Sequence, residues 1–84
     1  MKNFDETRFF DNNLYNDKDI YTILKEVVTI IESKGYNPTN QLMGYIKTSD
    51  PVFIPRDNGC REKIRMIEMD DILEFLLHFF IQES

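Results

Sequence analysis

The sequence predicts an all-α protein: a compact bundle of about four to five short helices behind a flexible N-terminal segment, assembled as a homodimer. Three observations support this class. Apolar residues recur with helical spacing between Ile20 and Ile31, as they do on one face of an amphipathic helix. Asparagine or aspartate directly precedes proline at positions 37–38 and 50–51, a pattern typical of helix starts. No stretch shows the alternation of a β-strand.

Size and composition indicate one small domain. The chain has 84 residues, of which 42% are hydrophobic, and a formal net charge of -5, which disfavours nucleic acid and anionic membranes as partners. Its single cysteine excludes an internal disulfide and fits a reducing compartment, so we expect a cytoplasmic protein. The turn-forming residues DNNLYND (11–17) separate an N-terminal segment, residues 1–16, from a helical domain, residues 17–84.

The first predicted helix covers residues 18–34. Its apolar stripe is followed by Gly35, which suits the left-handed position after a last helical turn. The stripe consists of Ile20, Ile23, Leu24, Val27, Val28, Ile30 and Ile31.

A second helix is predicted from Pro38 to about Thr48, capped by Asn37. Gly44 costs about 1 kcal/mol in a helix interior, so we expect it to admit another backbone at close range, with simple tolerance as the alternative. The expected buried side chains are Leu42, Met43, Tyr45 and Ile46.

The remaining elements are shorter. Pro55 limits residues 51–54 to one helical turn, which we expect to present Val52, Phe53 and Ile54 to the core. A further helix should start near Asn58 and extend to Glu68. The last helix should begin at Asp70 or Asp71, with Glu74 completing a capping box.

The last helix is apolar almost all around. In ILEFLLHFFI (72–81) only Glu74 and His78 are polar, and they lie four residues apart on one face. A monomer of this size can bury only one side of such a helix, and the other apolar sides need a cover. We therefore expect the protein to self-associate through this helix. The predicted dimer interface comprises Phe75, Leu76, Phe79 and Phe80. A central position in a monomeric bundle is the alternative, and docking on a membrane surface is disfavoured by the acidic polar stripe.

Basic side chains concentrate in one region. Arg56, Arg61, Lys63 and Arg65 lie within ten positions, and Arg61 and Arg65 are spaced to share a helical face. Guanidinium groups suit phosphate or a partner's carboxylate. The alternative is a solvated face neutralised by Asp57, Glu62 and Glu68.

Other functional classes have weaker support. His78 beside Glu74 fits a surface pair better than a general base, and no cluster of ligands indicates a metal or another cofactor. The thiolate of Cys60 could be favoured by Arg56 and Arg61, but no base accompanies it. A helix-turn-helix-like DNA-binding dimer is the alternative function, with Asn40, Gln41 and Lys47 available to read bases; a second helix with one positive charge argues against it.

Several motifs together resemble the IreB/ReoM family of small regulators in low-GC Gram-positive bacteria. They are GYNPTNQLMGYI (35–46), DPVFIPR (50–56), REKIR (61–65) and DDILEFL (70–76), and FDETRFF (4–10) is similar to the family's N-terminal pattern. The chain differs from that pattern at Cys60, where relatives usually have alanine, and at Met69, where they usually continue the basic series.

The resemblance implies a cytoplasmic, all-helical homodimer that is not an enzyme. Family members are substrates of a PASTA-type Ser/Thr kinase, and a PP2C-type phosphatase reverses the modification. Their phosphorylation controls peptidoglycan precursor synthesis, and thereby antibiotic resistance, through turnover of the enolpyruvyl transferase by Clp protease. By position, the resemblance implies Thr7 as the phosphoacceptor and Arg56, Arg61 and Arg65 as regulatory arginines. Phe4, Phe9 and Phe10 would then anchor the segment around Thr7.

Overall fold

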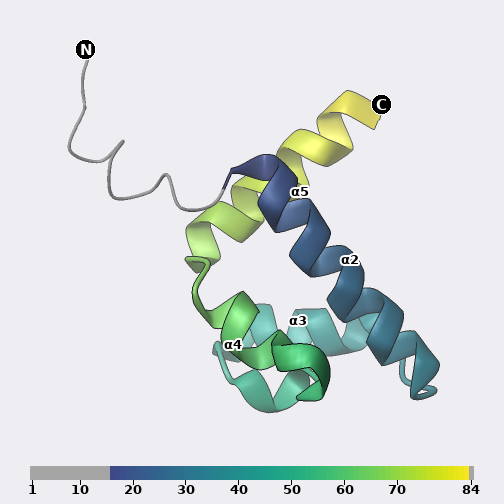
Figure 1. Ribbon diagram of the computed structural model, residues 1–84. Helices are drawn as coiled ribbons and strands as arrows, with labels where there is room; N and C mark the ends of the chain where they lie inside the picture. The colour runs from purple at the N-terminus through teal and green to yellow at the C-terminus, as the bar shows by residue number, and fades with distance from the viewer. Residues whose placement is uncertain (1–15, 84) are drawn as a thin grey trace.

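The computed structural model of the chain describes residues 16–83, and every regular element in that range is helical (Figure 1). The predicted all-α class is therefore confirmed for these residues. The predictions that concern Thr7, Phe4, Phe9 and Phe10 lie outside the described residues. The elements, in chain order, are α2 (Asp17–Ser33), α3 (Pro38–Thr48), the 3-10 turns η1 (Pro51–Phe53) and η2 (Asp57–Gly59), α4 (Cys60–Arg65) and α5 (Met69–Glu83).

Helix α2 is fixed at both ends by local hydrogen bonds. The Asn16 side chain accepts from the Asp19 amide at 2.9 Å, and the Asp19 carboxylate accepts from the Asn16 amide at 3.4 Å, which forms a capping box. At the other end Gly35 adopts φ +85°, and the amides of Gly35 and Tyr36 donate to the carbonyls of Glu32 and Ile31. The predicted helix over residues 18–34 is thus correct to within one residue.

Helix α3 begins and ends where the sequence predicts. The Asn37 side chain accepts from the Asn40 amide at 2.9 Å and Pro38 is the first helical residue. Among the expected buried side chains, however, only Tyr45 is buried, and Met43 is 43% exposed. The prediction for Met43 is wrong because α3 contributes only part of its circumference to the core: Tyr45 belongs to the core and Leu42 packs against it, whereas Met43 does neither.

The turn η1 forms as predicted, but one of its side chains, that of Val52, is exposed where burial was predicted. The Asp50 side chain accepts from the Val52 amide at 2.9 Å, so the cap-then-proline pattern does start a helical turn. Ile54 is fully buried, Phe53 is half-buried, and Val52 is 62% exposed. The expectation that Val52 enters the core is therefore wrong, because a single turn of 3-10 helix directs its three side chains apart.

The last two helices differ from prediction at their ends. Helix α4 stops at Arg65, not at Glu68, and the chain then turns so that Ile67 is buried. Helix α5 begins at Met69, and the amides of Asp71 and Ile72 donate to the Glu68 carbonyl. The predicted start of this helix at Asp70 or Asp71 is correct to within one or two residues, since Met69 and both aspartates form the first helical turn.

Gly44 has a definite packing role in α3. A Cβ atom on this residue would lie 2.5 Å from two ring carbons of Phe53. The close neighbour is therefore an aromatic side chain of η1 and not, as predicted, another backbone. Gly44 allows η1 to lie directly on α3.

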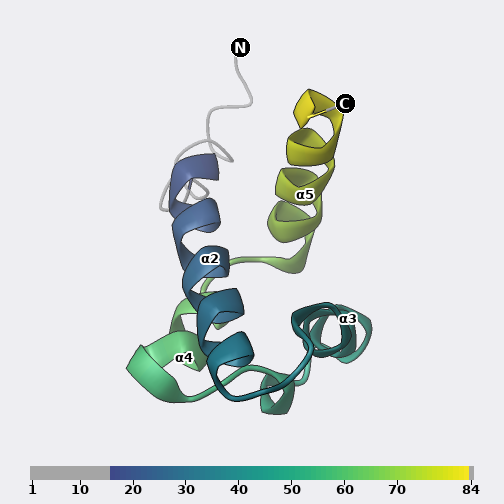
Figure 2. The same ribbon diagram turned by 90° about the vertical axis from the view of Figure 1, so that its right-hand side faces the viewer.

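The core surrounds α2. Helices α3 and α4 pack near the C-terminal part of α2, whereas α5 crosses its N-terminal part and extends beyond it (Figures 1 and 2). Buried side chains from all four α-helices and from the segments that follow η1 and α4 meet along this axis: Ile20, Leu24, Val27, Ile31, Tyr45, Ile54, Cys60, Ile64, Ile67, Ile72 and Phe75. The arrangement leaves α5 covered mainly on the side that faces α2.

Candidate functional site

Arg61 is held by the main chain of the preceding loop. Its Nε donates to the Ile54 carbonyl at 2.6 Å and one Nη donates to the Val52 carbonyl at 3.4 Å. The side chain is half-buried as a result. Arg61 thus has a structural task, the fixing of the 52–54 loop against α4, in addition to any role in binding.

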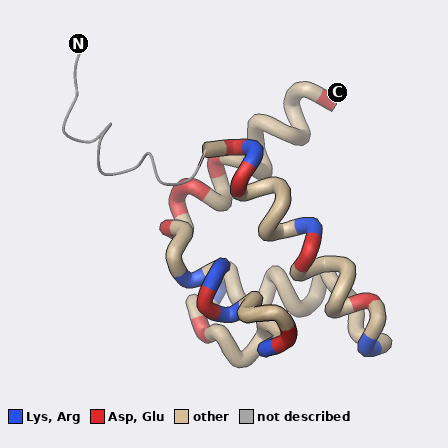
Figure 3. Tube along the Cα trace, in the orientation of Figure 1, with Lys and Arg blue, Asp and Glu red and all other residues tan. Residues whose placement is uncertain are grey.

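Arg56 and Arg65 are exposed on either side of Arg61 in the chain. Arg56 precedes η2, and Arg65 is the last residue of α4, four residues after Arg61. Arg65 lies close enough to Tyr45 to affect it: burial raises the pKa of the Tyr45 phenol, and the positive charge of Arg65 partly offsets this shift. The three arginines therefore lie on α4 and the corner that leads into it, and we call them the arginine cluster. Figure 3 shows the blue Lys and Arg segments along this part of the chain.

Two carboxylates near the arginine cluster, those of Asp57 and Glu26, form ion pairs with lysines. Asp57 pairs with Lys34 at 3.3 Å, and Glu26 pairs with Lys63 at 3.0 Å, which lowers the pKa of the Glu26 carboxyl. Within residues 16–83, no carboxylate oxygen lies within 4 Å of a nitrogen of the arginine cluster. Neutralisation by Asp57, Glu62 and Glu68, the alternative considered from the sequence, does not occur through ion pairs in this part of the chain.

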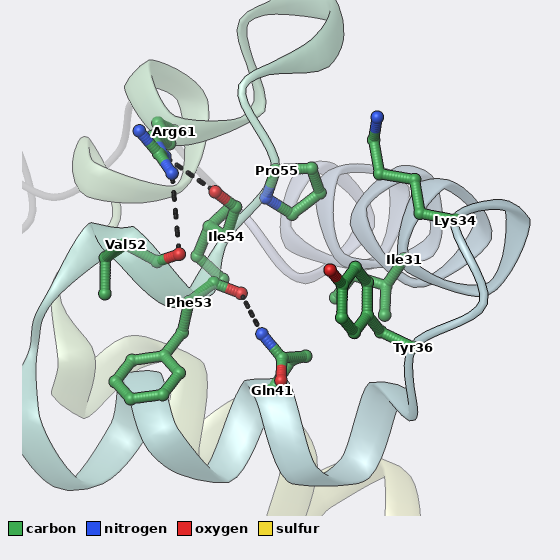
Figure 4. A pocket seen from close by; sticks show the side chains of 9 residues that line it. All are labelled: Ile31, Lys34, Tyr36, Gln41, Val52, Phe53, Ile54, Pro55 and Arg61. Atoms are coloured by element: carbon green, nitrogen blue, oxygen red, sulfur yellow. Dashed lines mark hydrogen bonds between the residues drawn. The ribbon is translucent and has the colours of Figure 1, made fainter.

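A cleft of about 250 Å³ adjoins Arg61. It lies between the end of α2, the start of α3 and the loop that contains η1 (Figure 4). We call it the loop cleft; its lining residues are Ile31, Lys34, Tyr36, Gln41, Val52, Phe53, Ile54, Pro55 and Arg61. Sequence reasoning did not identify this cleft, although most of its residues belong to the GYNPTNQ and DPVFIPR motifs.

The titratable groups considered for catalysis do not assemble into a site. Cys60 is fully buried, and burial raises the pKa of its thiol, with the charge of Glu26 adding to the effect. The suggestion that Arg56 and Arg61 favour the thiolate is therefore wrong. His78 is exposed on α5, 4.0 Å from Glu74 and 3.8 Å from Asp17. Over the described range, no group of three His, Cys, Asp or Glu residues is placed to hold a metal ion.

A second, apolar groove of about 210 Å³ lies between α2 and α5. Tyr21 lines it, with its ring centroid 6.3 Å from that of Phe75 and 6.2 Å from that of Phe79. Phe75 is 8% exposed and belongs to the core of the single chain. The other residues of the predicted interface remain accessible: Leu76 is 38% exposed, Phe79 45% and Phe80 68%.

The exposure of α5 decides between two expectations for this helix. Leu77 is 60% exposed and Ile81 64%, so α5 does not take the central position in a monomeric bundle that the sequence left open. The helix has no Lys or Arg. Its acidic residues are Asp70, Asp71 and Glu74 in the first half and Glu83 at the end, and the residues between Glu74 and Glu83 are neither Lys, Arg, Asp nor Glu (Figure 3). No helix of residues 16–83 has the length and apolar character needed to cross a membrane.

A family model for the IreB regulatory phosphoprotein matches residues 5–82 of the chain. The chain belongs to the IreB family. The resemblance stated from the motifs is thereby confirmed, and with it the class of regulatory phosphoprotein. The matched range contains Thr7, the arginine cluster, the loop cleft and almost all of α5, so the features described above belong to the IreB-type portion of the chain.

Proposed function

We propose that this IreB-family protein is a non-enzymatic, cytoplasmic regulator switched by phosphorylation of Thr7. The observation that carries the proposal is the family match, because it starts at residue 5 and thus includes Thr7. Phosphorylation adds about -1.5 to -2 charge at neutral pH, next to Asp5 and Glu6. Such a change alters which partners the N-terminal segment can bind.

In the proposed pathway a PASTA-type Ser/Thr kinase modifies Thr7 and a PP2C-type phosphatase reverses the modification. The phosphorylation state then controls peptidoglycan precursor synthesis through Clp-dependent turnover of the enolpyruvyl transferase. The arginine cluster supports a binding role, because its charges have no carboxylate partner within residues 16–83. Two versions follow: phospho-Thr7 docks on the arginine cluster of its own dimer, or it blocks a partner that uses that surface.

The DNA-binding alternative gains nothing from the geometry of α3. The Gln41 side chain, one of its candidate base readers, donates to the Phe53 carbonyl at 3.2 Å and is half-buried. It therefore serves the packing of η1 on α3. A regulator that binds other proteins remains the better proposal.

A kinase assay tests the Thr7 switch. The full chain is incubated with a purified PASTA-type kinase domain and ATP, and mass spectrometry locates the phosphate; we expect it on Thr7 and its loss in Thr7→Ala. The threonines of the folded domain are useful internal controls. The hydroxyls of Thr22, Thr29 and Thr48 donate to carbonyls one turn earlier in their helices, whereas Thr39 makes no such bond. Phosphate on Thr39 with Thr7 unmodified would contradict the proposal.

A further inference from the structure

Arg61 brings an unneutralised positive charge to the wall of the loop cleft. An arginine has five N–H donors, and hydrogen bonds to Ile54 and Val52 use two of them. The side chain is half-buried, and within residues 16–83 no carboxylate lies within 4 Å of it. A guanidinium fixed in this way has three donors left and is pre-organised for an anionic group.

Lys34 supplies a second positive charge to the same cleft. Its ammonium group lies at the opposite end of the upper edge from Arg61, with Pro55 between them (Figure 4). Lys34 pairs with Asp57 at 3.3 Å, but the two side chains are 45% and 46% exposed. Exposed ion pairs contribute little to stability, so an incoming anion can replace Asp57 at little cost.

The main chain of the cleft is not available for recognition. The carbonyls of residues 52–54 accept from Arg61 and Gln41, as the dashed lines in Figure 4 show. The amides of the same residues donate to Asp50 and Pro51, and Pro55 has no amide hydrogen. A ligand therefore cannot add to this loop as a β-strand, and side chains must recognise it.

Apolar side chains form the rest of the opening. Tyr36 and Val52 are each 62% exposed, and they lie on opposite sides of the cleft (Figure 4). The volume of about 250 Å³ is below the range of about 300–1,000 Å³ typical of small-molecule pockets. A cleft of this size suits one or two side chains of a longer ligand.

We propose that the loop cleft binds an extended acidic peptide segment of a partner protein. Anionic side chains of the peptide contact Arg61 at one end of the cleft and Lys34 at the other, and an apolar side chain packs between Tyr36 and Val52. The inference rests on the proposed function, because it gives the chemistry of a ligand for the surface that includes Arg61. The inference adds four residues that have no part in the proposed phosphorylation switch: Lys34, Tyr36, Gln41 and Val52.

A peptide titration followed by NMR tests the inference on the isotopically labelled full chain. The probe is a short peptide of alternating glutamate and leucine. We expect saturable shifts of the Tyr36 amide and of the Gln41 side-chain amide, which donates to Phe53 inside the cleft. A peptide with lysine in place of glutamate should bind at least about tenfold more weakly, and added salt should weaken the acidic peptide.

Val52→Glu places a negative charge at the opening without disturbing the core, since Val52 is largely exposed. It should weaken the acidic peptide about tenfold or more, whereas Met43→Glu, at an exposed residue outside the cleft, should not. Equal binding of the lysine peptide, an unchanged affinity of Val52→Glu, or the same shifts with inorganic phosphate alone would overturn the proposal. The titration uses unphosphorylated protein, so its failure is independent of the kinase assay on Thr7.

Discussion

The ring of Phe53 occupies the space in which a side chain on residue 44 would lie. A Cβ atom added to Gly44 would come within 2.5 Å of two ring carbons, well inside van der Waals contact. The main-chain carbonyl of Phe53 also accepts a hydrogen bond from the side-chain amide of Gln41, which lies three residues before Gly44 in α3. Ring and carbonyl together attach η1 to α3, and this attachment shapes one wall of the loop cleft.

We expect Gly44→Ala to destabilise the protein by up to about 2 kcal/mol, because an overpacking cost of about 1–3 kcal/mol exceeds the gain of about 1 kcal/mol from alanine in a helix. Urea unfolding at one protein concentration, followed by circular dichroism, measures the change. In Phe53→Leu, which has a smaller side chain, the same glycine substitution should cost less. A Gly44→Ala variant as stable as the parent chain would contradict the close packing.

The attachment of Arg61 to the loop predicts a stability effect separate from binding. Arg61→Lys replaces a planar guanidinium by a single ammonium group, which cannot serve the Ile54 and Val52 carbonyls in the same geometry. We expect a loss of about 1–2 kcal/mol in the free energy of unfolding.

The matched control is Arg65→Lys, four residues later in α4, where the side chain is exposed and its change should stay within about 0.5 kcal/mol. Equal effects of the two substitutions in urea unfolding would show that the Arg61 hydrogen bonds contribute little. If the prediction holds, a functional defect of an Arg61 variant has to be separated from lost stability, and Arg56 or Arg65 variants test binding more cleanly.

These contacts also indicate how far the sequence determines the fold and the site. The ends of α2 and α3 are predictable because Asn16, Asn37 and Gly35 act through hydrogen bonds to residues a few positions away. The exposure of Val52 is different, because it depends on how Gln41 and Arg61 hold the loop.

The site follows the same division. The concentration of positive charge around Arg61 can be read from the sequence. The hydrogen bonds of Arg61 cannot, because their acceptors are main-chain carbonyls, which every residue has. The loop cleft is likewise a tertiary feature, built where α2, α3 and the η1 loop meet.

Burial of Cys60 predicts an unreactive thiol and a pH effect on stability. Its pKa is raised above the ordinary value of 9.0, chiefly by burial, because the folded state favours the neutral thiol. This contribution to stability is fully present below the pKa of the unfolded chain and is lost as pH rises toward the folded pKa. We expect slow reaction with a thiol reagent at neutral pH, fast reaction in urea, and less alkaline loss of stability in Cys60→Ala. Rapid labelling of the folded protein would contradict the burial.

The apolar surface of α5 predicts a homodimer that a charge on this helix disrupts. Leu76 and Phe79 line the groove with Tyr21 yet remain 38% and 45% exposed. A glutamate at either position would be buried unpaired in the proposed interface, at a cost of several kcal/mol. Since 1.4 kcal/mol corresponds to tenfold in affinity, we expect dimer dissociation about a hundredfold easier or more.

Sedimentation equilibrium measures the mass of the parent chain, Leu76→Glu and Phe79→Glu, with circular dichroism to confirm that each variant is folded. Val52→Glu is the control, because it adds the same charge at an exposed apolar residue outside the α2–α5 groove. Phe75 is unsuitable as a test position, since it is 8% exposed and its substitution would disturb the core of the single chain. A parent chain that stays monomeric at all concentrations, or a Leu76→Glu variant that dimerises as before, would remove α5 as the dimer interface.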